Sequence, residues 1–107
     1  LKRQKMDENI RVINNKELMR FEVNINGEFA FIEYRMYKGD MAFMHSVVPE
    51  SFKGKGIGSA MARAGLDYAN KENLKIMLYC PFVSKFVKEH EEYHHLVDAK
   101  YHPAYKK

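Results

Sequence analysis

The feature that most constrains the fold is a strand, a glycine-rich turn and a helix that follow one another within residues 41–61. Residues 41–48 are largely apolar and predict a mostly buried strand. Pro49 ends this strand because it has no N–H for the hydrogen-bond ladder. Three glycines follow within residues 54–58, and a helical pattern begins at once. In such an arrangement main-chain N–H groups converge on an anion, and the glycines leave room for a phosphate to approach them.

Two common phosphate-binding patterns do not fit this turn. A P-loop ends in Gly-Lys-Ser/Thr, whereas here Ser59 follows Gly58 directly. A dinucleotide-binding turn needs G-x-G-x-x-G and an acidic residue at the end of the second strand, but Tyr79 and Cys80 end that strand. The spacing therefore argues against both patterns and leaves a turn of another phosphate-binding type.

The first half of the chain predicts an antiparallel meander. Apolar and polar residues alternate over residues 21–25, which indicates a half-buried strand. Asn26-Gly27 is a strong hairpin signal because both central positions of a type I′ turn need positive φ. The return strand is expected over residues 28–37, and a short edge strand is expected at residues 10–13.

The second half predicts one βαβ unit and a further helix. Apolar residues recur at three- and four-residue steps over residues 56–70, so this helix presents one face to a sheet. Residues 74–79 form a buried-strand pattern, and the crossover rule places this strand parallel to strand 41–48. A second helix is expected from residue 81 or 82 to residue 93. The predicted class is α+β, an antiparallel meander that leads into a βαβ unit with a second, C-terminal helix.

Composition sets the broad class of the protein. The chain has 107 residues, 46% of them apolar, which predicts a single domain over 1–107, with residues 1–8 and 97–107 expected to be flexible. The net charge of +4 suits an anionic partner. The one cysteine allows no internal disulfide and favours a reducing compartment. No stretch approaches about 18 consecutive apolar residues and the N-terminus is charged, so we expect no membrane span or signal peptide and a cytoplasmic location.

Two other kinds of site are not expected. His90 and His94 stand four apart on a predicted helix, but no further pattern supplies the remaining ligands of a metal. The lysines are spread along the chain without an aromatic and basic platform, so nucleic acid is not an expected partner.

Two motifs resemble a known family. Residues 53–58, Lys-Gly-Lys-Gly-Ile-Gly, resemble the [Q/R]-x-x-G-x-[G/A] signature of the GNAT acetyltransferase superfamily, with Lys53 in the place of Gln or Arg. Residues 80–83, Cys-Pro-Phe-Val, and 90–93, His-Glu-Glu-Tyr, are similar to the C-P-[FY]-V…H-P-E-Y ending of a small single-domain subgroup. Glu91 stands where that subgroup usually has proline. The resemblance implies a minimal GNAT-like fold and an N-acetyltransferase that moves the acetyl group of acetyl-coenzyme A to an amine.

The resemblance also implies where the coenzyme binds. Amides at the helix start would hold the pyrophosphate, the lysines would add attraction for phosphates, and the end of strand 41–48 would pair with the pantetheine arm. The expected coenzyme-binding residues are Ser46, Val47, Val48, Lys53, Gly54, Lys55, Gly56, Ile57, Gly58 and Ser59.

Two residues near the expected thioester are candidates for catalysis. His45 can accept a proton from the amine because imidazole titrates near the working pH, and its apolar neighbours predict that burial keeps it neutral. Cys80 is expected to act either as a nucleophile that takes the acetyl group or as a proton donor to the leaving thiolate. Each has a structural alternative: His45 as a hydrogen-bonded core residue, and Cys80 as an inert core thiol.

The acceptor is left open by the sequence. A protein lysine, a protein N-terminus or a small amine would each suit the predicted chemistry. The alternative function is a coenzyme A-binding or interaction module without turnover. Neither hypothesis calls for a membrane partner.

Overall fold

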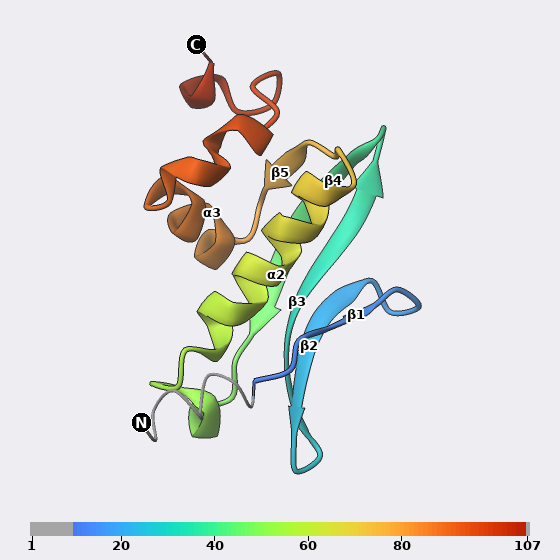
Figure 1. The fold of residues 1–107 in the computed structure, drawn as a ribbon, viewed down its shortest axis with the longest axis vertical. Helices are drawn as coiled ribbons and strands as arrows, with labels where there is room; N and C mark the ends of the chain where they lie inside the picture. The colour runs from blue at the N-terminus through green and yellow to red at the C-terminus, as the bar shows by residue number, and fades with distance from the viewer. Residues whose placement is uncertain (1–9, 107) are drawn as a thin grey trace.

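A computed structural model describes residues 10–106 and places helices against a five-stranded sheet (Figure 1). The strands lie side by side in chain order. They are β1 (Ile13–Asn15), β2 (Arg20–Ile25), β3 (Glu28–Tyr37), β4 (Asp40–Val47) and β5 (Ile76–Leu78). The helices are η1 (Glu50–Phe52), α2 (Ile57–Lys71), α3 (Pro81–Lys88), η2 (Glu91–Leu96) and η3 (Pro103–Tyr105). The predicted α+β class is confirmed, whereas the flexible end predicted for residues 1–8 lies outside the described residues.

Strands β1 to β4 form the predicted meander. Each pairs antiparallel with the next one along the chain. The β2–β3 hairpin turns at Asn26 and Gly27, whose φ angles are 55° and 84°, as a type I′ turn requires. The Gly27 N–H also donates to Oδ1 of Asn24 at 2.9 Å, which fixes the turn. The edge strand begins only at Ile13, later than the sequence predicted.

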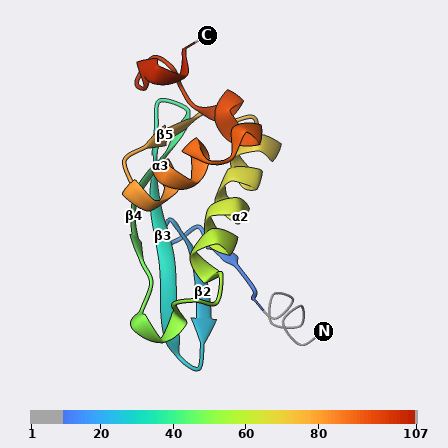
Figure 2. The same cartoon turned by 90° about the vertical axis from the view of Figure 1, so that its left-hand side faces the viewer.

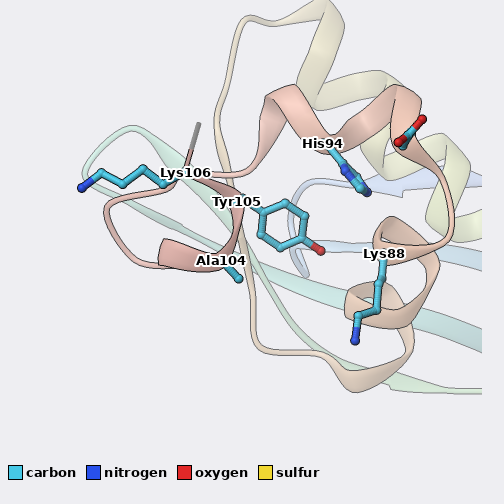
Figure 3. A pocket seen from close by; sticks show the side chains of 6 residues that line it. Lys88, His94, Ala104, Tyr105 and Lys106 are labelled. Atoms are coloured by element: carbon cyan, nitrogen blue, oxygen red, sulfur yellow. The ribbon is translucent and has the colours of Figure 1, made fainter.

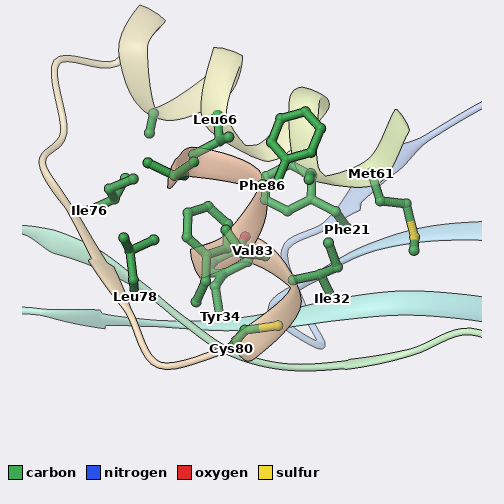
Figure 4. Packing of buried hydrophobic residues seen from close by; sticks show 14 of the residues in the cluster. Phe21, Ile32, Tyr34, Met61, Leu66, Ile76, Leu78, Cys80, Val83 and Phe86 are labelled. Carbon is green, nitrogen blue, oxygen red and sulfur yellow. The ribbon is translucent and has the colours of Figure 1, made fainter. Parts of the chain in front are cut away.

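Helix α2 runs along one face of the sheet, and α3 packs on the same side (Figures 1 and 2). Alternate residues of β3, among them Ile32 and Tyr34, are buried under these helices. Gly65 lies in the middle of α2, and a Cβ there would stand 3.0 Å from Cε1 of Phe43, so the absent side chain is what lets the ring approach. The core therefore fills the space between this face of the sheet, α2 and α3 (Figure 4).

Strand β5 pairs parallel with β4, as the βαβ pattern predicts. It is shorter than the predicted strand over residues 74–79 because the preceding residues close helix α2 instead. Asn73 has φ 59°, and the Leu74 N–H donates to the Ala69 carbonyl at 2.8 Å. This is the Schellman pattern of helix ends, and it takes Leu74 out of the strand.

The second predicted helix is split in two. Helix α3 ends at Lys88, and the backbone at His90 has φ −131°, outside the helical region. The His90 ring turns back so that Nδ1 lies 2.6 Å from the Phe86 carbonyl, which satisfies one of the last acceptors of α3. The chain then continues in the tighter turns of η2.

The C-terminal segment, residues 97–106, covers the outer edge of β5, although the sequence predicted no structure there. Val97 bridges Ile76, and the Asp98 N–H donates to the Ile76 carbonyl at 3.0 Å. The Leu78 N–H donates to Nε2 of His102 at 2.9 Å. These contacts satisfy backbone groups that an exposed edge strand would leave open. Within residues 10–106 none of the helices has both the length and the apolar character of a membrane span.

Candidate functional site

The glycine turn before α2 has the geometry of an anion site. Gly54 and Gly56 have φ angles of 79° and 74°, and a Cβ built on either would meet nothing within 4 Å. Gly56 caps the helix, and among the described residues no side chain caps it. The Gly56 carbonyl accepts the N–H of Ala60 at 3.0 Å, so the amides of residues 57–59 precede the first intrahelical donor. These amides face outward at the positive end of a 15-residue helix.

Two lysines flank this turn. Lys53 Nζ lies 3.6 Å from Oε1 of Glu50, and both side chains are well exposed. An exposed ion pair of this kind contributes little to the stability of the fold, so Lys53 can exchange Glu50 for a ligand with more negative charge. Lys55 is exposed in the turn itself. The local field therefore favours a ligand that carries several negative charges.

Strands β4 and β5 separate next to this turn. Their last paired residues are Phe43 and Leu78. Beyond them, the N–H groups of Tyr79 and Cys80 both donate to the Phe43 carbonyl, at 2.9 and 2.8 Å, and the chain turns away into α3. The rest of β4 pairs with β3 alone among the described residues, and it includes Ser46 and Val47. The two strands therefore part after Phe43 and Leu78, and Phe82, which follows at the start of α3, lies against Gly58 of the glycine turn.

His45 lies on the face of the sheet that α2 and α3 do not cover. It pairs across the ladder with Glu33, and its ring centroid lies 6.2 Å from that of Phe31. The side chain is exposed, so the burial that the sequence predicted for this histidine is wrong. The reason is a bulge: Tyr34 pairs with Phe43 and Glu33 with His45, which leaves Met44 as an extra residue.

Cys80 lies in the core. It is 0% exposed and belongs to the same apolar cluster as Ile32 and Val83 (Figure 4). Cys80 also precedes the first residue of α3, and its carbonyl accepts the Ser84 N–H at 2.9 Å. The backbone of Cys80 and the strand that carries His45 therefore meet at Phe43, while the two side chains lie in different surroundings.

A groove between α2 and α3 adds residues that the sequence did not single out. Its volume is about 280 Å³, and it is lined by Ser59, Arg63, Phe82, Lys85, Phe86, Glu89 and His90. Ser59 and Arg63 stand one turn apart on α2, so their shared face was readable from their spacing of four. The contribution of Lys85 was not readable, because it depends on how α3 packs beside α2. The groove begins at the start of α2 and contributes two further cations, Arg63 and Lys85, which lie 3.7 and 3.8 Å from carboxylate oxygens of Glu92 and Glu89 in exposed pairs.

Comparison with known proteins settles the family. The family model described as GCN5-related N-acetyl-transferase matches residues 20–96, which include the glycine turn and both separating strands. The chain belongs to the GCN5-related N-acetyltransferase family. Members of this family generally bind acetyl-coenzyme A, so the family accounts for an anion site beside two parted strands.

Relatives within the family cover most of the chain. Protein NATD1 of Xenopus tropicalis is 35% identical over 83 residues, which are 75% of this chain and 76% of that protein. Human Protein NATD1 is also 35% identical over 83 residues, 75% of this chain and 74% of that protein. The NMR structure of a GCN5-like protein from Staphylococcus aureus superposes with a TM-score of 0.67 at 22% identity and covers 84% of this chain and 89% of that one. At this identity the structural match establishes the family fold alone.

A second cavity and His94 lie away from the glycine turn. A cavity of about 600 Å³ beyond the C-terminal end of α3 is lined by Lys88, Glu91, His94, Ala104, Tyr105 and Lys106 (Figure 3). None of the site residues expected from the sequence lines it. His94 places Nε2 2.8 Å from the Val87 carbonyl. Within residues 10–106 no group of three or more histidine, cysteine, aspartate or glutamate side chains is arranged to hold a metal.

The hydroxyl of Tyr93 links α2 to η2. It donates to Oδ1 of Asp67 at 2.7 Å and accepts from Nη1 of Arg63 at 3.2 Å. Burial and the neighbouring Asp67 carboxylate raise the pKa of Tyr93. Tyr93 therefore stays a neutral donor, and its contacts orient Arg63 at the edge of the α2–α3 groove.

Proposed function

We propose that the protein is an N-acetyltransferase that moves the acetyl group of acetyl-coenzyme A to an amine. The observation that carries this proposal is the uncapped start of α2 behind Gly54 and Gly56, which adjoins the gap between β4 and β5. A diphosphate at the helix and an extended arm in the gap match the two ends of coenzyme A. The donor set fits the group, because amides, lysines and positions without Cβ all suit a phosphate.

The phosphates would be held from the helix side. The amides of Gly56, Ile57, Gly58 and Ser59 and the side chains of Lys53 and Lys55 would bind the pyrophosphate. The groove between α2 and α3 would receive the nucleotide end, with Arg63 and Lys85 near its phosphate and the exposed Phe82 ring as a stacking surface.

The arm of the coenzyme would run along the free edge of β4. Backbone groups of Ser46, Val47 and Val48 have no partner on β5 in the described part of the chain and would pair with its amides. When bound, acetyl-coenzyme A supplies an acetyl thioester, whose carbonyl carbon is open to attack by a neutral amine.

His45 would accept the proton that the amine loses on attack. Its exposed imidazole lies on the uncovered face, where an acceptor can reach it, and Glu33 stands opposite it on β3. The sequence predicts Cys80 as a nucleophile or as a proton donor to the departing thiolate. Complete burial of Cys80 argues against both roles, because in each the thioester must reach its thiol, and it favours direct attack by the amine with the thiolate protonated from solvent.

A non-catalytic coenzyme A-binding module is the second candidate. The same burial of Cys80 favours it, because the one thiol of the chain is not open to solvent.

We further propose that the chain belongs to the small single-domain subgroup with the C-P-F-V…H-x-E-Y ending, that it acts in the cytoplasm, and that it needs no membrane or nucleic acid. The acceptor amine would belong to a protein lysine, a protein N-terminus or a small molecule, and a panel of amines distinguishes these three classes.

Two measurements separate the candidates. Isothermal titration with acetyl-coenzyme A tests binding, and release of free thiol in the presence of an amine panel tests turnover. For the enzyme, we expect His45→Gln to lower kcat by about 10²- to 10⁴-fold, as loss of a general base does, with the Kd of acetyl-coenzyme A unchanged. Tight binding without thiol release from any amine would instead favour the binding module. Acetyl-Cys80 found by intact mass after rapid quenching would indicate the covalent route.

A further inference from the structure

We propose that a groove on the sheet face opposite α2 and α3 binds the acceptor, and that this acceptor is a small primary amine with an apolar arm. The inference rests on the proposed acetyltransferase function and adds its substrate class. The groove has a volume of about 360 Å³. Its lining is mostly aromatic and thioether side chains: Met36, Tyr37, Met44, Met77, Tyr79 and Tyr101.

The groove lies on the opposite face of the sheet from the proposed coenzyme site. Arg35 and Ala42 pair across β3 and β4 and both line it. Side chains alternate along a strand, so these two point away from the core that holds their neighbours Tyr34 and Phe43. A ligand in the groove would approach β4 from one side while the coenzyme lies against the helices on the other.

The groove ends where the reaction is expected. Met44 and Tyr79 immediately follow Phe43 and Leu78, the last paired residues of β4 and β5. They are also the sequence neighbours of His45 and Cys80. An amine held by its arm against Met44 and Tyr79 would therefore present its nitrogen at the opening between the strands, beside the proposed proton acceptor.

The lining identifies the arm of the ligand as apolar. Met36, Tyr37, Met44 and Tyr79 are 47, 46, 40 and 50% exposed, although each is a large apolar side chain. Contiguous exposed side chains of this kind mark binding surfaces. The groove is near the lower end of the range of small-molecule sites, about 300–1,000 Å³, which suits a small amine better than a folded protein segment.

The charges around the groove argue against a polyamine. Arg35 lines it, and among its described lining residues none is acidic. Just outside the lining, burial and then the neighbouring Asp98 raise the pKa of Asp40, the partner of Tyr37 on β4, while Lys100 and Lys75 oppose this rise, so the charges there are mixed. The positive charge of Arg35 in the lining disfavours a ligand with several ammonium groups, and it favours the neutral form of a single amine, which is the nucleophilic form.

The test compares phenethylamine with spermidine on the full chain. We expect phenethylamine to be acetylated with the lower KM. Tyr79→Ala and Tyr101→Ala should each raise that KM about three- to tenfold, the loss of one aromatic contact, while the Kd of acetyl-coenzyme A stays within twofold. Tyr105→Ala is the matched control, because this tyrosine lies in the same C-terminal segment outside the groove. Met36→Glu, at an exposed site, should shift the preference towards spermidine.

A binding measurement keeps this inference separate from the proposed function. Titration of the protein with phenethylamine alone should move the NMR ring signals of Tyr37, Tyr79 and Tyr101, and those of Tyr105 should stay in place. If acetyl-coenzyme A does not bind, the proposed function fails while this titration still tests the groove. Unmoved Tyr79 and Tyr101 signals, or an unchanged amine KM in both alanine variants, would overturn the inference.

Discussion

Replacement of Gly56 by alanine separates the role of this residue in folding from its role in binding. The residue has φ 74°, a conformation that costs roughly 1–2 kcal/mol for a residue with a Cβ. No atom lies within 4 Å of the added Cβ, so no clash increases this cost. For a domain of this size each 1 kcal/mol lowers the Tm by about 4–8 °C. We therefore expect Gly56→Ala to lower the Tm by several degrees and leave the protein folded at 25 °C.

The added methyl group should affect binding more than stability. It would project into the open space over the start of α2, where an anion must approach the amides of Ile57 and Gly58. A hydrogen bond to a charged group contributes about 1.5–3 kcal/mol. Loss of one such bond corresponds to an increase of about ten- to a hundredfold in the Kd of acetyl-coenzyme A, measured by isothermal titration.

Gly39 supplies the matched control. It has φ 87° in the β3–β4 turn, and again nothing lies within 4 Å of an added Cβ. Gly39→Ala should therefore lower the Tm by a similar amount with no change in Kd. The reasoning is refuted if both variants lose similar stability and bind acetyl-coenzyme A as the unaltered chain does.

Two further predictions concern stability. Gly65→Ala should lower the Tm, because the added Cβ would stand 3.0 Å from the buried ring of Phe43. Gly58→Ala should be tolerated, because its Cβ would stand 3.0 Å from the ring of Phe82, which is partly exposed and can move. Equal Tm values for the two variants would contradict this. Burial and then the neighbouring Asp98 raise the pKa of Asp40 from 3.8 to about 6. A raised carboxyl pKa stabilises the folded state at low pH, and this contribution is lost as the pH rises through 6, so the Tm of the protein relative to Asp40→Asn should fall between pH 4 and pH 7. Asp98, whose pKa is lowered from 3.8, acts in the opposite sense below that window, and parallel Tm curves for the two proteins would rule the effect out.

Local signals were enough to predict the meander and the crossover. Asn26-Gly27 determines its own turn, and alternation over β2 and β3 determines which residues face the core. The glycine turn was also predictable, since Gly54 and Gly56 adopt the positive φ that their lack of Cβ permits. These features depend on neighbours along the chain, which a sequence displays directly.

What was missed depends on distant partners. Leu74 fits a buried strand by composition, but its N–H is taken by the end of α2. The last residues of the chain have weak periodicity, and they are ordered by the open edge of β5, which their sequence does not reveal. Likewise the cations of the α2–α3 groove meet only after the two helices pack together, so Lys85 carried no local sign of its place there.

The bulge at Met44 depends both on the local sequence of β4 and on its pairing with β3. Regular alternation would put His45 on the same face as Phe43, under the helices, and this is the burial that the sequence predicted. One extra residue reverses the register, so that Phe43 still packs into the core while His45 pairs with Glu33 on the uncovered face. In the proposed reaction the same strand would thereby offer its free backbone edge to a coenzyme at α2 and its imidazole to an acceptor from the opposite side. In this member of the family, the β-bulge at Met44 explains how one strand could contact both substrates of the proposed transfer.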